Sequence, residues 1–170
     1  MWKKLHSLYP DILPALTSPL VCRGYNPRAL KRAEGVVLDK PGKADHDTPA
    51  SYRLIVLLET LSKIIERLVA NRLSAQAREL GLINSNQCGS VAGVSAFHAV
   101  ASLNHEVVIA QKLRLKASTL FLDIKGGFDN IRPNTLTDYL QKKGVSPYIT
   151  AWVRSFLCHR TCRLAFQGAP

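Results

Sequence analysis

The clearest pattern in the chain is an apolar stripe with helical spacing that begins at Leu58. Its members recur three or four positions apart and are Leu58, Leu61, Ile64, Ile65, Leu68, Val69 and Leu73. Charged residues lie largely off this stripe, so one face of the helix is predicted to be buried and the other solvated. Gly81 is predicted to end the helix.

Further helices are predicted from similar patterns. Ser95 is expected to cap a helix whose apolar stripe begins at Phe97. Beyond residue 130, one helix is expected over about residues 134–143, and another opens at Pro147. Near the N-terminus, prolines interrupt a loosely helical spacing over residues 2–25, which predicts two short helices rather than one long helix.

Several short segments have the composition of strands. Residues 35–40 and 52–57 are apolar runs separated by a polar loop, and they are predicted to pair as a hairpin. Residues 118–124 form a short apolar run bounded by turn-forming residues, the pattern of a buried strand. A final basic strand is predicted over residues 161–166. Together these elements predict a helix-rich α+β fold without the regular alternation of a doubly wound sheet.

The composition allows a packed core and suggests an anionic partner. The 170 residues are 46% hydrophobic and 21% charged, which suits one compact unit or a piece of one. The formal net charge is +11, an excess that lowers the electrostatic cost of approaching a phosphate backbone. Charge alone gives roughly even odds that the chain binds nucleic acid, because many basic proteins bind none.

The cysteines and the hydropathy indicate an intracellular protein. The four cysteines lack the dense spacing of a disulfide scaffold. Cys158, His159 and Cys162 lie close in sequence, but a helix-to-strand junction would make their side chains diverge, so three unrelated residues are favoured over a zinc site. No apolar run approaches the roughly 20 residues of a membrane span, and no signal-peptide core is present.

Asp123 is the first candidate for chemistry. It ends an otherwise apolar run, where an ionised carboxylate is costly to desolvate unless a cation or hydrogen-bond donors receive it. A divalent metal is one such partner, whereas a lone aspartate at a strand end more often reaches solvent. Asp129 follows a Gly-Gly pair and suits either a second carboxylate or a helix entry, and spacing does not choose between them.

Residues 121–130, Phe-Leu-Asp-Ile-Lys-Gly-Gly-Phe-Asp-Asn, resemble the first catalytic motif of reverse transcriptases from LINE-type (non-LTR) retrotransposons. Other segments resemble the family in the family's own order. They are residues 38–43, 51–55, 57–63 and 70–73 upstream, and residues 143–145 and 152–157 downstream. The ordered set covers nearly the whole chain and is far more specific than any single motif.

The resemblance implies a right-hand polymerase fold, of which this chain would contain the fingers and an incomplete palm. Residues 1–115 would form the N-terminal helices and the fingers region, and residues 116–170 the start of the palm. The implied activity is RNA-directed DNA polymerisation. Its partners would be an RNA template, a DNA primer and deoxynucleoside triphosphates, without a membrane, and its cofactor would be Mg²⁺.

The resemblance also implies roles for single residues. Asp123 would be a ligand of both Mg²⁺ ions of a two-metal site, with the carbonyl of Ile124 as a further oxygen ligand. Phe128 would be the steric gate that leaves no room for a 2′-hydroxyl; its other interpretation is a plain core phenylalanine. Lys40 and Arg53, on facing strands, would bind the triphosphate by charge-assisted hydrogen bonds, although Lys40 equally suits a solvated strand end.

Some positions depart from the family pattern. Residues 87–96 lack the arginines that usually follow the family's Gln-Phe-Gly motif, which is expected to weaken binding by about 1 kcal/mol or more per lost charged hydrogen bond. Leu54 replaces the usual proline after Tyr-Arg, and Asp39 precedes Lys40. These differences are typical of a copy that has drifted.

The family's Pro-Gln-Gly segment and Ala-Asp-Asp hairpin do not occur within the 170 residues. One aspartate holds two adjacent divalent ions poorly, because much of the attraction that offsets their dehydration is missing. This polypeptide is therefore predicted to be truncated and catalytically incomplete on its own. The alternative is a non-enzymatic, basic nucleic-acid-binding remnant, which the charge of +11 favours.

Overall fold

The computed structural model describes residues 7–42, 47–124, 126–127 and 130–165. The chain divides into two compact units, one formed by Met1–Leu80 with Arg132–Pro170 and the other by Gly81–Ile131. The boundary near residue 115 concerns the family's fingers and palm rather than packing, and it stays a prediction.

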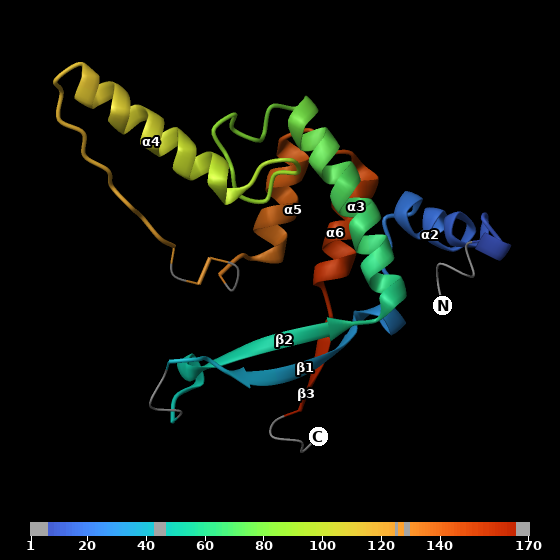
Figure 1. Ribbon diagram of the computed structural model, residues 1–170. Helices are drawn as coiled ribbons and strands as arrows, with labels where there is room; N and C mark the ends of the chain where they lie inside the picture. The colour runs from blue at the N-terminus through green and yellow to red at the C-terminus, as the bar shows by residue number, and fades with distance from the viewer. Residues whose placement is uncertain (1–6, 43–46, 125, 128–129, 166–170) are drawn as a thin grey trace. The chain divides into compact units, whose positions relative to one another are not determined.

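The first unit contains a small three-stranded sheet. Its strands are β1 (Arg32–Asp39), β2 (Tyr52–Leu58) and β3 (Thr161–Ala165), in the order β2-β1-β3 (Figure 1). β1 and β2 pair antiparallel, so the predicted hairpin is confirmed. β3 lies where a final strand was predicted, and it pairs parallel to β1. The local sequence pattern gave no indication of this parallel pairing.

Helices α2 (Ile12–Cys22), α3 (Thr60–Glu79), α5 (Pro133–Lys142) and α6 (Pro147–Leu157) complete the first unit. α3, α5 and α6 confirm the predicted helices, and α2 is one of the two helices predicted over residues 2–25; residues 2–6 of that range lie outside the described residues. α6 packs against α2, α3 and α5. The buried apolar core includes Val21, Ile65, Val69, Leu140, Val145, Ile149 and Trp152. Among the described residues, no helix combines the length and the apolar character that a membrane span requires.

Side-chain hydrogen bonds fix both ends of α6 to distant segments. At its N-terminus, the Ser146 backbone N–H donates to Gln76 Oε1 at 3.0 Å, and Gln76 Nε2 donates to Ser146 Oγ at 2.8 Å. Gln76 thus satisfies a backbone donor that a helix terminus leaves without an intrahelical partner. Near the C-terminus of α6, Ser155 Oγ accepts the backbone N–H of Asn26 at 3.0 Å.

The second unit contains helix α4 (Ala96–Lys112). Ser95 is its N-cap residue, as predicted, and the Ser95 backbone N–H donates to His98 Nδ1 at 3.1 Å. His98 is exposed on the surface of the helix. None of the residues of α4 is buried, so within its own unit the helix has no covered apolar face.

The predicted strand at residues 118–124 is wrong, because none of these residues pairs in a sheet with any described residue. Leu120, Phe121 and Leu122 are 81%, 80% and 84% exposed. A strand is stabilised by ladder hydrogen bonds and by burial of its side chains against neighbouring strands. The apolar composition of this segment predicted an element whose stability depends on a partner strand, and the described chain supplies none.

α2 ends in a Schellman motif centred on Gly24. The Gly24 N–H donates to Val21 O at 3.0 Å, and the Tyr25 N–H donates to Leu20 O at 2.9 Å. Gly24 has a φ of +62°, in the left-handed region that glycine adopts without a steric penalty.

The Gly24 backbone also lies directly against α6. A Cβ at this position would be 2.6 Å from Ala151 Cβ and 3.0 Å from the backbone oxygen of Tyr148. Gly144, which ends α5 in the same kind of motif with a φ of +83°, has only Leu80 Cδ2 nearby, at an ordinary 3.7 Å.

We expect Gly24→Ala to lower the free energy of unfolding more than Gly144→Ala. Both variants carry a left-handed strain of about 1 kcal/mol, and only the first adds a backbone overlap with α6 worth about 1–3 kcal/mol. Urea unfolding of both variants, followed by far-ultraviolet circular dichroism, measures the difference. Equal losses would show that α6 shifts freely and that the close approach is not a constraint.

Candidate functional site

The predicted triphosphate ligands lie near the loop end of the β1–β2 hairpin. Arg53 is exposed on β2 and pairs with Leu38. Lys40 follows β1, and its backbone N–H donates to Ser51 O at 2.9 Å, which continues the same register. Paired residues, and every second residue along a strand, share one face of a sheet. Lys40 and Arg53 therefore share a face of the hairpin.

The predicted metal ligands lie in the second unit. Asp123 is exposed in a segment without regular structure, and its Oδ1 accepts the backbone N–H of Ile124 at 2.9 Å. Ile124 is 81% exposed. Phe128 and Asp129 lie outside the described residues. The structure thus brings Lys40 and Arg53 together within the first unit, and Asp123 and Ile124 are adjacent within the second.

The described residues do not fit a two-metal site by themselves. Two adjacent divalent ions need several oxygen ligands that converge on them. Within the described part of the chain, no group of three or more histidine, cysteine, aspartate or glutamate side chains converges in this way. Asp123 alone offers one exposed carboxylate, so no catalytic step through a metal follows from this arrangement.

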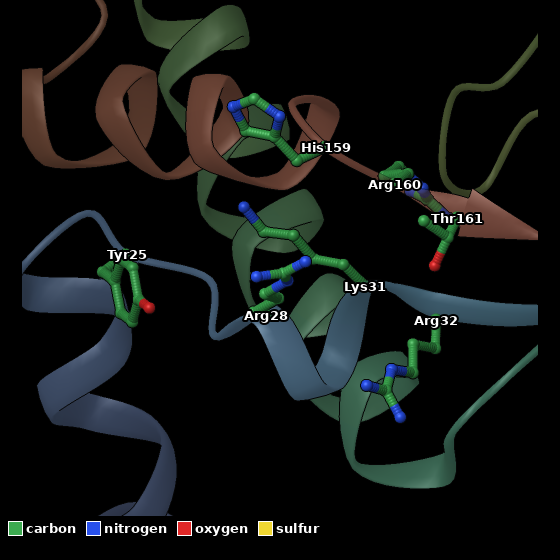
Figure 2. Close-up of a pocket in the computed structure, with 7 residues that line it drawn as sticks. All are labelled: Tyr25, Arg28, Lys31, Arg32, His159, Arg160 and Thr161. Atoms are coloured by element: carbon green, nitrogen blue, oxygen red, sulfur yellow. The ribbon is translucent and has the colours of Figure 1, made fainter.

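A second feature, which the sequence did not predict, is a basic cavity of about 650 Å³ in the first unit (Figure 2). We call it the basic pocket. Its lining residues are Tyr25, Arg28, Lys31, Arg32, His159, Arg160 and Thr161. Four of these residues are Arg or Lys, and none is a carboxylate. The lining therefore carries a concentrated positive charge.

A single turn of 3₁₀ helix, η1 (Arg28–Lys31), places two of these cations side by side. Residues three apart are eclipsed in a 3₁₀ helix, so Arg28 and Lys31 extend from the same side of the turn. Figure 2 shows both side chains in the space between Tyr25 and His159. Arg32 is the first residue of β1 and follows the turn directly.

An aromatic stack positions the fourth cation, Arg160. The Arg160 guanidinium carbon lies 4.2 Å from the centroid of the Phe156 ring, within cation–π distance. Phe156 stacks on Trp152, with ring centroids 5.0 Å apart and an interplanar angle of 15°. Trp152 is 3% exposed and belongs to the core, so the stack links Arg160 to the buried core of the unit.

Lys31 is the most buried cation of the basic pocket, with 8% of its surface exposed. Among the residues that the structure describes, no carboxylate forms an ion pair with it. Lys31 and His159 also line a neighbouring cavity of about 400 Å³, together with Thr150. The Thr150 hydroxyl is buried without a hydrogen-bond partner among the described residues. An anion near Lys31 would therefore meet both an uncompensated charge and an unused hydroxyl.

Two carboxylates line a different cavity that shares Arg32 with the basic pocket. Glu34 and Glu59 face that cavity, which Arg32 and Arg163 also line. Arg32 therefore lines both the basic pocket and the cavity that contains Glu34 and Glu59. Arg28, Lys31 and Arg160 line the basic pocket, and Lys31 also lines the neighbouring cavity; neither lining contains a carboxylate. The positive charge of the basic pocket is not neutralised from within its own lining.

Comparison with known families identifies the chain. Residues 38–169 match the family described as reverse transcriptase (RNA-dependent DNA polymerase). The match covers more than half of the chain, and the chain belongs to this family. Within the family, it is a partial reverse-transcriptase domain of the non-LTR retrotransposon type, as the following relatives indicate.

Relatives come from mobile elements of Drosophila melanogaster. The chain is 34% identical over 150 residues to the RNA-directed DNA polymerase from mobile element jockey, which covers 85% of this chain and 16% of the relative. It is 33% identical over 122 residues to the probable RNA-directed DNA polymerase from transposon BS, covering 72% of this chain and 13% of the relative. The probable RNA-directed DNA polymerase from transposon X-element is 30% identical to the chain over 133 residues, which cover 78% of this chain and 14% of the relative. The chain thus spans about one-seventh of the length of these relatives.

Only part of the basic pocket could be predicted from the sequence. Arg28, Lys31 and Arg32 are close enough in sequence to suggest a local basic patch. Arg160 comes to the same cavity because Thr161 pairs with Arg32 in the parallel β1–β3 ladder. No local pattern predicts that pairing.

We expect Lys31→Met to raise the free energy of unfolding by about 1 kcal/mol at low salt. The change removes a nearly buried cation that has no carboxylate partner in the described structure and keeps a side chain of similar length. The gain should shrink as salt screens the repulsion between the pocket cations. Urea unfolding at two salt concentrations tests this, with exposed Lys63→Met as the matched control. A loss of stability in Lys31→Met would contradict the expectation.

Proposed function

We propose that this chain forms the nucleotide-facing front part of a non-LTR reverse transcriptase, comprising the fingers and the beginning of the palm of a right-hand polymerase fold. The observation that carries the proposal is the common placement of Lys40 and Arg53 on one face of a hairpin that the family match includes from residue 38 onward. The substrates of the complete enzyme would be deoxynucleoside triphosphates on an RNA template with a DNA primer.

Arg53 is the principal triphosphate ligand in this proposal. Its guanidinium is exposed, and within the described residues it forms no ion pair or hydrogen bond. A planar guanidinium can donate two parallel hydrogen bonds to phosphate oxygens, which gives both affinity and orientation. Lys40 would add a second cation from the facing strand.

Asp123, Ile124 and Phe128 would complete the nucleotide site. Reverse transcriptases use divalent metal ions, and Mg²⁺ would supply charge neutralisation at the triphosphate when it is bound. Asp123 and the Ile124 carbonyl would be ligands of that ion, and the ring of Phe128 would exclude a 2′-hydroxyl. Since one carboxylate does not fit two ions, the 170-residue polypeptide is proposed to be inactive by itself.

Primer extension tests the predicted inactivity. The 170-residue chain and its Asp123→Ala variant are incubated with an RNA template, a DNA primer, deoxynucleotides and Mg²⁺, after circular dichroism has established that both are folded. We expect no extension from either protein, because two metal ions need several converging oxygen ligands and the described residues offer no such group. Extension that Asp123→Ala abolishes would show that a working metal site assembles, and the proposed incompleteness would be wrong.

Nucleotide binding tests the role of Arg53. We expect Arg53→Gln to weaken binding of a fluorescent deoxynucleoside triphosphate by roughly tenfold, because a charge-assisted contact to phosphate is lost. Arg53→Lys should lie between wild type and Arg53→Gln, since lysine keeps the charge and loses the two-pronged contact. Arg67→Gln is the matched control, because Arg67 is an exposed arginine on α3. An equal loss in the control would mean that net charge, rather than Arg53, holds the nucleotide.

The second candidate function is a non-enzymatic nucleic-acid-binding remnant. The observation that favours it is the basic pocket, which lies outside the proposed nucleotide site and depends on no metal ligand. This function requires RNA affinity that falls steeply with salt. A chain that binds no RNA in low salt would exclude it.

A further inference from the structure

The geometry points to a nucleic-acid site in the basic pocket: we propose that it binds the phosphate backbone of a single strand while the Tyr25 ring stacks on one of its bases. This goes beyond the proposed nucleotide site and rests on the proposed function only for the choice of nucleic acid over other polyanions.

The charge of the basic pocket fits a chain of phosphates better than one small anion. Arg28 and Lys31 extend side by side from η1, while Arg160 enters from the position immediately before β3 (Figure 2). The cations thus come from separate segments around a cavity of about 650 Å³. Each contact with a phosphate releases condensed counterions from the nucleic acid, which favours binding. It also relieves the repulsion between the uncompensated pocket cations.

Tyr25 supplies the feature that distinguishes a single strand from other polyanions. Its side chain lines the basic pocket and is 52% exposed, so one part of the ring is available to a ligand. The Schellman motif fixes its backbone, because the Tyr25 N–H donates to Leu20 O at 2.9 Å. An aromatic platform beside a positively charged groove is the usual arrangement in proteins that bind single strands, since every base has a face that can stack.

The basic pocket is separate from the proposed triphosphate site. Arg32 lies at the first position of β1, and Asp39, which precedes Lys40, lies at the last. Seven residue steps at about 3.3 Å each place the two ends of β1 roughly 23 Å apart. One triphosphate cannot reach both ends, so cations at the basic pocket contact a different part of the nucleic acid from the groups that Lys40 would hold.

The test is fluorescence anisotropy of a labelled, unstructured oligouridylate with the full 170-residue chain. The double variant Arg28→Gln/Arg160→Gln is compared with Lys63→Gln/Arg67→Gln, which removes the same charge from the exposed surface of α3. Each lost phosphate contact lowers the slope of log affinity against log salt by about 0.7. We therefore expect the pocket variant to lose about 1.4 in slope and roughly 25-fold in affinity near 0.1 M salt. The control should change far less.

Tyr25→Leu tests the stacking part separately. We expect about a tenfold loss of affinity for the oligonucleotide with an unchanged salt slope, because stacking contributes without releasing counterions. Inorganic polyphosphate serves as a competitor without bases, and its binding should not respond to Tyr25→Leu. An unchanged oligonucleotide affinity in Tyr25→Leu would overturn the assignment to a single strand.

The remaining outcomes also decide the proposal. Absence of RNA binding at low salt, no loss in the pocket variant, or equal losses in the pocket and α3 variants would each overturn it. If loss of the contact with Phe156 unfolds the Arg160 variant, Arg28→Gln against Arg67→Gln repeats the comparison with an expected slope change of about 0.7. Deoxynucleotide affinity should be unchanged in Arg28→Gln, whereas it falls in Arg53→Gln. A failed triphosphate site and a failed basic pocket are therefore distinguishable.

Discussion

The packing of α6 is the constraint on which the rest of the first unit depends. Ile149 and Trp152 are almost completely buried, and they face helices from both ends of the sequence. α6 holds α2 through the close approach of Gly24, and it meets α3 through the paired hydrogen bonds of Gln76 and Ser146. Since β3 follows α6 directly, the same packing decides where β3 meets β1.

This arrangement couples stability to the placement of charge. The stack of Trp152, Phe156 and Arg160 begins in the core and ends at the lining of a cavity, so burial of Trp152 helps to fix the position of a cation beyond the end of α6. Lys31 is held close by with little exposure and no described carboxylate partner. Evolution for stability alone favours neutral or paired groups at such a place. An unrelieved concentration of cations is more typical of a surface adapted to a ligand.

Local periodicity predicted most of the elements and part of the candidate site. The apolar stripe from Leu58 predicted α3, and the two apolar runs separated by a polar loop were enough to place Lys40 and Arg53 on facing strands. These features depend on interactions within about ten residues or on one short loop, and a sequence pattern records them directly.

Features that depend on distant partners could not be predicted in this way. Phe121 and its apolar neighbours have strand composition, yet they form no strand because no described segment pairs with them. Arg160 reaches the same cavity as Arg28 only through the parallel ladder between β1 and β3. The family resemblance supplied roles for Asp123 and Phe128 that the residue pattern alone left open, and those roles stay predictions.

The parallel pairing of β1 with β3 has a consequence for how the chain acquires its structure. The β1–β2 hairpin can close soon after residue 58 has been synthesised, but the other edge of β1 meets Thr161 and its neighbours only after residue 161 has been synthesised. Closing such a long loop is entropically costly and slow compared with local contacts. During that interval the free edge of β1 can pair with another chain, which makes early folding sensitive to protein concentration.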